Sequence, residues 1–264
     1  MWRVIRSSLR ANLLRLVTTS IAVVLGVGFT AGTLTLKDSI GATFDALFDQ
    51  VGDGVDVVVQ GQTQFSGPFL GDQRLDLPAT LATQIAGVDG VASVAGVVID
   101  QAQFVDPAGE PIGSSFGVPP IGRNWVDDPA LSAWRIFEGR PPTAPDEVVV
   151  NRATAREHGF AVGDEVEVIV VGEPRRFTLV GTARFGDFDS VAGATTALFE
   201  TSAAQAMYGR GDTFDEIDVA AADGVAPDLL AQRVRTAIGP VAEVRTGAEG
   251  TEETKSAIAG ALDS

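Results

Sequence analysis

A stretch of twenty-one uncharged residues, from Leu16 to Leu36, constrains this chain more than any other feature. As an α-helix it would be about 31 Å long, which matches the hydrocarbon thickness of a lipid bilayer. Arginine is the only charged residue type before this stretch, whereas the chain from Asp38 onward is rich in acidic residues. Because basic flanks stay on the cytoplasmic side, the pattern predicts a membrane helix with its N-terminus inside the cell and the remainder outside.

A cleaved secretory signal is the alternative interpretation, because both kinds of segment place an apolar run after basic residues. The run here is longer than the roughly 7–15 apolar residues that are typical of a signal. The nearest candidate cleavage motif also places the bulky Phe29 where a small residue is required. The sequence therefore favours a membrane anchor.

Small residues recur at four-residue spacing within the predicted span. Ala22 and Gly26 form one such pair, and Gly28 and Gly32 form another. This spacing lets a second membrane helix approach closely, so it predicts helix packing at these four positions. The alternative is that they reflect only the general abundance of glycine and alanine in membrane helices.

Charge and cysteine content exclude several classes of protein. Without the four N-terminal arginines, the 19 basic residues fall to 15 against 35 acidic ones, a formal charge of −20, so no binding of nucleic acid is expected. The chain has no cysteine, which excludes disulfides and thiolate metal sites. Neither Lys37 nor Lys255 follows a glycine, so the chain lacks the phosphate-binding loop of an ATPase.

Two apolar stripes at helical spacing predict helices that connect the outer domain to the membrane. The stripes are Ile40, Phe44, Leu47 and Phe48, and Ile258, Ala261 and Leu262. Each needs an apolar partner, so we expect the two stalk helices to pack together. The predicted order is a cytoplasmic basic N-terminus (1–15), a transmembrane helix (16–36), an outer stalk helix (37–51), an extracytoplasmic core domain (52–245) and a second stalk helix (246–264).

The core domain mixes strands and helices, so the predicted fold class is α+β, with a mixed α/β extracytoplasmic domain that contains a β-rich subdomain. Strands are predicted at 55–60, 147–151, 165–171, 176–183, 195–199, 216–221 and 243–245 (an edge strand), with a β-rich run at 91–105. Helices are predicted at 78–86, 152–158, 202–208 and 228–238, the last with Leu229, Leu230, Val234 and Ile238 on one side. Irregular structure is predicted at 61–73 and 106–128, a hairpin turn at 172–175, and a β-bulge at Gly96.

No set of catalytic residues can be recognised, so we expect neither enzymatic activity nor a cofactor. His158, the only histidine, precedes Gly159 and is interpreted as part of a helix end and not as a catalytic base. Two acidic clusters lack the spacing of a calcium-binding loop and are interpreted as surface carboxylates. These clusters are Asp187 with Asp189, and Asp215 with Glu216 and Asp218.

Three runs in the second half of the chain carry a resemblance to a known family. They are GRPPTAPDEVVVN (139–151), AREHGFAVGDEVEV (155–168) and RFTLVGTA (176–183). Together with the basic N-terminus and the long span, they resemble the first half-unit of the FtsX-like ABC transporter permeases, whose outer part is the MacB-type periplasmic core domain. The matching residues are Gly139, Arg140, Pro142, Glu147, Val148, Gly163, Asp164 and Val166. These residue types build turns and a hairpin, so the motif indicates a fold and not an active site.

The resemblance implies that the chain is a fragment of a permease subunit, with the second stalk helix leading toward a further span. It also implies a separate cytoplasmic ATPase of the ABC class, whose ATP hydrolysis would drive export or the transmission of motion to the outer domain. Further permease helices or a second permease copy, membrane lipid and an extracytoplasmic accessory protein are the other partners that it implies.

Two other functional interpretations remain open at the level of sequence. One is a single-span, membrane-anchored extracytoplasmic binding module that recognises a ligand through the loop 106–128. The other is an anchored hydrolase, which the lack of a nucleophile with a matching base disfavours.

Overall fold

The computed structural model describes residues 17–29, 32, 54–67, 71–113, 119–191 and 193–252. The chain divides into two units, Met1–Ala46 and Leu47–Ser264, which are considered separately. In the first unit, residues 17–29 and residue 32 are helical. No helix among the described residues has both the length and the apolar character needed to cross a bilayer, so the span at 16–36 stays a prediction. The stalk positions Ile40, Phe44, Leu47, Phe48, Ile258 and Leu262 lie outside the described residues.

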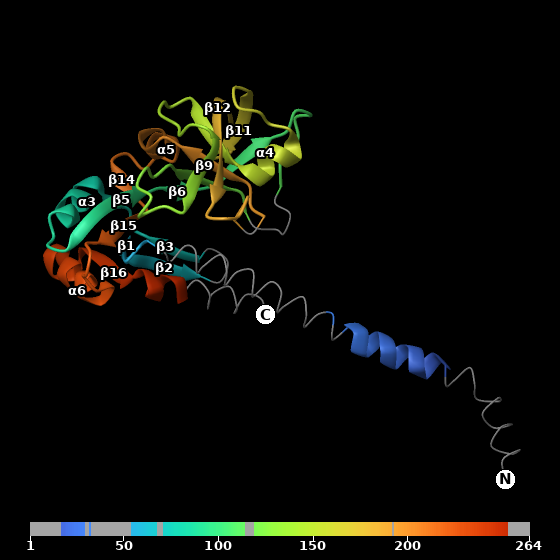
Figure 1. The fold of residues 1–264 in the computed structure, drawn as a ribbon, viewed down its shortest axis with the longest axis horizontal. Coiled ribbons are helices and arrows are strands. Elements are labelled where there is room, and N and C mark those ends of the chain that lie inside the picture. The colour runs from blue at the N-terminus through green and yellow to red at the C-terminus, as the bar shows by residue number, and fades with distance from the viewer. Residues whose placement is uncertain are drawn as a thin grey trace, which may run out of the picture. The chain divides into compact units, whose positions relative to one another are not determined.

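Four antiparallel strands and two helices form what we call the α/β lobe of the second unit (Figure 1). The strand order is β16-β1-β15-β5, with bounds β1 (Val57–Gly61), β5 (Val91–Val97), β15 (Glu216–Ala221) and β16 (Ala242–Thr246). Helices α3 (Ala79–Ala86) and α6 (Pro227–Ile238) cover one face, and a short turn η1 (Gly239–Val241) follows α6. The core between sheet and helices contains Val57, Val59, Ile217 and Val219 from the strands and Leu81, Ile85, Leu230 and Val234 from the helices. Alternate strand residues thus face the helices, as the β period requires.

Two predictions in this lobe are wrong. The stretch 61–73 forms most of a hairpin of β2 (Thr63–Gly67) and β3 (Gly71–Arg74) instead of a loop. Its polar side chains give no alternating signal, and it is held by backbone pairing and by an ion pair of 2.8 Å between Arg74 and Glu243. In α6, Leu229 is 44% exposed whereas Leu230 is fully buried, because adjacent residues on a helix point about 100° apart.

A mixed eight-stranded sheet forms the second part, which we call the β-rich lobe (Figure 1). The strand order is β6-β8-β13-β10-β12-β11-β7, with β9 paired to β12. The strands are β6 (Ile99–Asp100), β7 (Ala102–Val105), β8 (Ile121–Asn124), β9 (Trp134–Gly139), β10 (Glu147–Asn151), β11 (Glu165–Val170), β12 (Glu173–Phe185) and β13 (Thr196–Phe199). Helices α4 (Arg152–His158) and α5 (Thr201–Met207) pack against the same core as Phe104, Phe177 and Phe199. A minor strand pair, β4 (Leu77–Pro78) with β14 (Thr213–Phe214), completes the second unit as described.

The hairpin of β11 and β12 turns more tightly than the sequence predicted. Val170 pairs directly with Glu173, so only Val171 and Gly172 form the turn, with φ of 53° and 79°. Positive φ at both positions gives the turn a twist that matches the flanking strands, and β12 therefore begins at Glu173 instead of Arg176. The predicted alternation in β11 is confirmed, because Val166 and Val168 are buried while Glu165 and Glu167 are exposed.

Two further corrections concern the middle of the chain. The stretch 106–128 is not wholly irregular, because it contains β8, which pairs with β13 in parallel and with β6 in antiparallel orientation. Gly96 is not a bulge, because it pairs in register with Ile217. This position has no room for a side chain, because a Cβ here would lie 2.4 Å from the ring of Phe214.

Candidate functional site

The joint between the two lobes is built around a buried asparagine, Asn124, at the end of β8. Its side-chain carbonyl accepts a hydrogen bond of 2.8 Å from the N–H of Val98, in the segment that links β5 to β6. Its amide donates to the carbonyl of Gly96 at 2.9 Å and to the hydroxyl of Thr201 at 3.2 Å. Asn124 is 2% exposed, so these bonds are shielded from water. One side chain thus fixes the segment by which the chain crosses between lobes.

The returning segment is fixed to the same place by Asp215, between β14 and β15. Its backbone N–H donates to the carbonyl of Val97 at 2.9 Å, and its carboxylate accepts from the N–H of Ile99 at 2.8 Å. Arg210 lies 3.0 Å from the Asp215 carboxylate and 3.4 Å from that of Asp100. Burial raises the pKa of Asp215, and the N–H of Ile99 and the charge of Arg210 oppose this rise only in part. Outgoing and returning strands are therefore tied to each other.

Apolar contacts complete the joint. Phe214 packs against the cores of both lobes. A separate cluster of Val97, Val126, Leu131 and Ala220 joins the outer face of the four-stranded sheet to the loop that follows β8. The joint thus combines directional polar contacts with a small apolar cluster. Together these contacts hold the two lobes in a defined arrangement.

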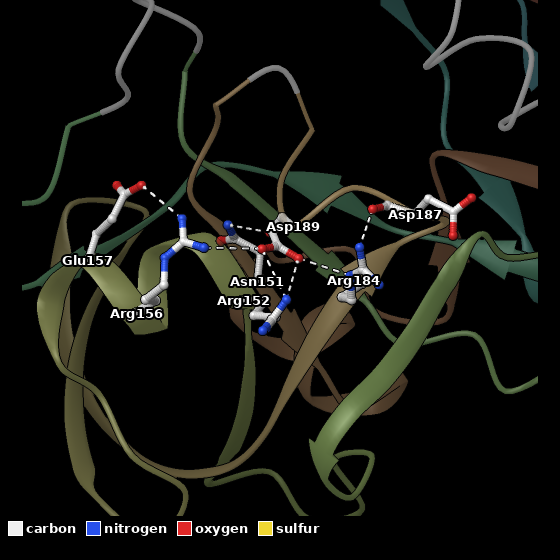
Figure 2. A network of polar contacts seen from close by, with 7 residues as sticks. All are labelled: Asn151, Arg152, Arg156, Glu157, Arg184, Asp187 and Asp189. Carbon is white, nitrogen blue, oxygen red and sulfur yellow. Dashed lines mark hydrogen bonds and ion pairs between the residues drawn. The ribbon is translucent and has the colours of Figure 1, made fainter.

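A second polar network surrounds Asp189, in the connection from β12 to β13 (Figure 2). Its carboxylate accepts from Arg152 at 3.1 Å, from Arg184 at 2.9 Å and from Arg156 at 3.4 Å. Its backbone carbonyl accepts from the amide of Asn151 at 3.3 Å. Burial acts to raise the pKa of Asp189, but the hydrogen bonds and charges of Arg152 and Arg184 outweigh it and hold this pKa below its ordinary value. The network fixes this connection to the first turns of α4.

The arginines of this network make further contacts beyond Asp189. Figure 2 shows Arg156 directed also toward Glu157, at 3.9 Å, and Arg184 toward the backbone carbonyl of Asp187. The guanidinium of Arg152 also lies 4.0 Å from the ring centroid of Phe137. Each of the three arginines thus already has acceptors, which are the carboxylates of Asp189 and Glu157 and the backbone carbonyl of Asp187. We interpret the network as a structural tie.

The residues of the family motif shape a turn and fill the core. Glu147 binds Arg140 through both carboxylate oxygens, one of them at 2.8 Å from the arginine, and accepts from the N–H of Thr143 at 2.8 Å. The hydrogen bond from Arg140 lowers the pKa of Glu147 most strongly, and with the other contacts brings it to about 2. Gly139 has φ of 79°, and a Cβ there would lie 2.2 Å from the carbonyl oxygen of Val180. Pro142 belongs to the same turn.

The remaining motif residues lie elsewhere in the β-rich lobe. Gly163, with φ of 102°, and Asp164, whose carboxylate accepts from the N–H of Ala161, form the turn before β11. Val148 and Val166 are buried in the core of the lobe. The structure thus brings Gly139, Arg140, Pro142 and Glu147 together and places the others elsewhere in the lobe.

The other predicted positions fall into two groups. Ala22, Gly26 and Gly28 lie on the exposed helix 17–29, and residue Gly32 is also helical. Not all members of the two acidic clusters are surface carboxylates. Asp218 is 6% exposed, and Asp189 and Asp215 are ion-paired and half-buried, so the interpretation is wrong for these three. Within the described ranges, no group of three or more candidate ligands could hold a metal ion.

His158 ends α4 as predicted. Gly159 follows it with a left-handed φ of 71°, and the imidazole stacks on Phe160 with ring centroids 6.2 Å apart. Sequence reasoning missed the roles of Asn124 and Arg210. A polar residue at the end of a short strand was the only signal for Asn124, and nothing in the sequence marked Arg210, whose partners come from three separate segments.

One known protein family matches most of this chain. The sequence profile of a family described as the MacB-like periplasmic core domain matches residues 16–237. No curated protein matches the chain. The periplasmic region of MacB from Actinobacillus actinomycetemcomitans is similar in structure, with a TM-score of 0.54 and 13% identity over 78% of this chain and 95% of that one. The extracellular domain of the ABC-type transporter YknZ from Gram-positive bacteria has a TM-score of 0.45 and 11% identity, covering 72% of this chain and 98% of that one.

Proposed function

The chain belongs to the family of the MacB-like periplasmic core domain, and from this we propose that it is the extracytoplasmic part of an ABC-type permease subunit. In this proposal Leu16–Leu36 spans the membrane, the N-terminus lies in the cytoplasm, and a separate ABC ATPase binds on the cytoplasmic side. The ATPase hydrolyses ATP, and the described domain passes the resulting motion to the space outside. The uncharged stretch, the N-terminal arginines and the lack of a phosphate-binding loop support these assignments.

The observation that carries the proposal is that the chain enters and leaves the four-stranded sheet at the same end. Val57, at the start of β1, pairs with Thr246, at the end of β16, and the next backbone bond joins Gly247 to Asp56 at 2.9 Å. The segments that lead to the two predicted stalk helices therefore leave the α/β lobe next to each other. Paired stalks on adjacent strands would act on the sheet as one unit.

The β-rich lobe is connected at the other end of the same sheet. Gln60, near the end of β1, pairs with Glu216, and Glu216 pairs with Val97, where the chain crosses to the β-rich lobe. If the stalks displaced the end of the sheet at Val57 and Thr246, the displacement would therefore travel along the length of the strands before it reached the joint. Strands bonded on both sides are stiff along their length, so the joint is the place where relative motion of the lobes can occur.

A second connection bypasses the sheet. A Cβ on Gly54 would lie 2.3 Å from the carbonyl oxygen of Ala130, so the segment before β1 lies directly against a loop of the β-rich lobe. Gly54 has φ of 151°, which a side chain would disfavour. The segment nearest the predicted stalk thus contacts both lobes.

Two experiments test the proposal. A reporter that is active only outside the cytoplasm, fused after Thr251, should be active, and an inactive fusion in an inserted protein would contradict the orientation. The tagged full-length protein should also purify with an ABC ATPase from its native membranes and change the ATPase rate on co-reconstitution. If the protein functions with no ATPase bound, the single-span binding module is the better account.

A further inference from the structure

The cluster around Arg210 at the joint contains more acidic groups than basic ones. The guanidinium lies 3.0 Å from the carboxylate of Asp215, 3.4 Å from that of Asp100 and 4.0 Å from that of Asp76. These carboxylates come from three separate places in the chain, because Asp215 precedes β15, Asp100 ends β6 and Asp76 precedes β4. One positive charge is therefore shared among three negative charges at neutral pH.

Arg210 does not contact the three carboxylates equally. Asp215 and Asp100 both approach the same terminal nitrogen of the guanidinium, so these two carboxylates are neighbours. The Nε of Arg210 is buried without a hydrogen-bond partner, because Asp76 at 4.0 Å is too far away to accept a hydrogen bond. Carboxylates at such short separations repel each other, and water screens this repulsion only weakly where the groups are partly buried.

The network around Asp189 has the opposite composition. There a single carboxylate contacts three arginines, Arg152, Arg156 and Arg184. Burial acts to raise the pKa of Asp189, but the hydrogen bonds and charges of Arg152 and Arg184 hold it below its ordinary value. The folded state therefore favours the ionised form. The contribution of this network to stability is present above the ordinary pKa of about 3.9 and is lost as the pH falls through the lowered value.

The environment of Asp215 instead favours its proton. Burial raises the pKa of Asp215 above its ordinary value, and the negative charge of Asp76 raises it further, while the N–H of Ile99 and the charge of Arg210 oppose this rise only in part. The folded state therefore binds this proton more tightly than the unfolded chain does. The resulting contribution to stability is complete below the ordinary pKa of about 3.9 and is lost as the pH rises through the raised value.

Asp215 can take up a proton without losing its place in the joint. Its carbonyl oxygen can still accept from the N–H of Ile99, and its backbone N–H still donates to the carbonyl of Val97. Arg210 then has only Asp100 and Asp76 to neutralise. Protonation thus removes a repulsion while the backbone contacts of the joint are kept.

The other charged or titratable groups around the cluster do not reverse this direction. Tyr208, at the end of α5, stays neutral because burial raises its pKa. Arg123, which pairs with Ile99 between β8 and β6, keeps its charge at every pH considered. Glu216 follows Asp215 and accepts a hydrogen bond of 3.0 Å from Gln60, so it adds a further negative charge near the joint.

We propose that the joint between the lobes is an acid-stabilised clamp, in which the three carboxylates around Arg210 hold the crossing segments more firmly in acid than at neutral pH. The Asp189 network responds in the opposite direction, so strong acidification weakens the connection to α4 while the joint is kept. The clamp depends only on contacts within the second unit and not on an ATPase partner, so its test is independent of the proposed function.

Hydrogen exchange of backbone amides in the full chain tests the clamp. The reporters are the amide of Ile99, which is bonded to Asp215, and the amide of Ala153, which is bonded to the carbonyl of Asp189. After correction for the intrinsic effect of pH on exchange, the protection of Ile99 should rise several-fold between about pH 7 and about pH 4. The protection of Ala153 should stay constant over this range and fall below about pH 4. Protection of Ile99 that stays constant or falls between about pH 7 and about pH 4 would overturn the proposal.

Three variants separate the clamp from a general effect of acid. Asp215→Asn replaces the carboxylate by a neutral amide and should keep Ile99 protected independently of pH. Asp76→Asn should move the rise in protection to lower pH, because it removes a negative charge that favours the proton, and it tests the clamp even if Asp215→Asn does not fold. Asp212→Asn is the matched control, since it removes an exposed carboxylate from the same connection and should respond as the wild type does. A wild-type response to pH in Asp215→Asn or in Asp76→Asn would exclude the cluster as the cause and overturn the clamp.

Discussion

The backbone N–H of Gly247 donates a hydrogen bond of 2.9 Å to the carbonyl of Asp56, which joins the segment after β16 to the segment before β1. A Cβ on Gly247 would lie 2.0 Å from the carbonyl oxygen of Val55. The two segments therefore approach each other too closely for any other residue. This contact brings together, at one end of the four-stranded sheet, the two chain segments that lead toward the predicted stalks.

We expect Gly247→Ala to lower the free energy of unfolding by about 1–3 kcal/mol, because the backbone of Val55 would have to move. Gly250→Ala is the matched control, since a Cβ there meets no atom within 4 Å and alanine favours the helical conformation that residues 247–252 adopt. Chemical denaturation of both variants measures the difference. Equal stability of the two variants would show that the segments are not in contact.

Gly96→Ala should lower the free energy of unfolding by a similar amount, about 1–3 kcal/mol, because its Cβ would overlap the ring of Phe214. A smaller side chain at position 214 should relieve the clash. In a double-mutant cycle, Gly96→Ala should therefore cost less in a Phe214→Leu background than in the wild type. If the two substitutions had additive effects on stability, the clash with the Phe214 ring would not be the cause of the loss. Gly87→Ala, where the nearest contact is an ordinary 3.5 Å, serves as the control.

Removing the clamp at the joint should expose the crossing segment. Asn124→Ala leaves the N–H of Val98 without its buried acceptor, at an expected cost of about 2–3 kcal/mol. Hydrogen exchange at the amide of Val98 should become faster than at amides in the centre of β10. Gln101→Ala, which truncates an exposed amide nearby, should change neither quantity. Unchanged exchange at Val98 in Asn124→Ala would contradict the clamp.

The pair of Glu147 and Arg140 should give a pH-dependent contribution to stability. Folding lowers the pKa of Glu147 to about 2, so the native state favours the ionised form and its contribution is present above the ordinary pKa of about 4.3. At neutral pH, Glu147→Gln should cost about 1–2 kcal/mol, a value reduced by the exposure of Arg140. The difference from the wild type should shrink as the pH falls from about 4 toward 2. A difference that does not depend on pH would mean that packing, and not charge, is lost.

Transmission through the predicted membrane helix can be tested with Leu36→Pro in the full-length protein, with Leu36→Ala as control. A proline interrupts the helix, whereas an alanine preserves it. In reconstituted membranes, the proline variant should keep the proposed ATPase partner bound but lose the output that ATP hydrolysis would drive. Wild-type output in the proline variant would refute a rigid helical connection.

The sequence alone determined the features that depend on a residue and its close neighbours. The alternation of valine and glutamate in β11 requires one dry and one wet face, and the structure shows both. Gly159 ends α4 because a left-handed conformation is available to glycine at little cost. The family motif also lies within one continuous part of the chain, so its resemblance could be recognised before any contact was known.

Only the tertiary structure decided what lies opposite each side chain. Asp218 is one of 35 acidic residues in the sequence, and nothing near it in the chain indicates that it is only 6% exposed. Asn124 and Gly96 are distant in sequence from most of the groups that they contact. A periodic pattern reports which face of an element is buried, but the partner of that face is set by how elements pair across the fold. For this reason strands with an apolar pattern, such as β10 and β11, were predictable, whereas the polar hairpin of β2 and β3 and the joint between the lobes were not.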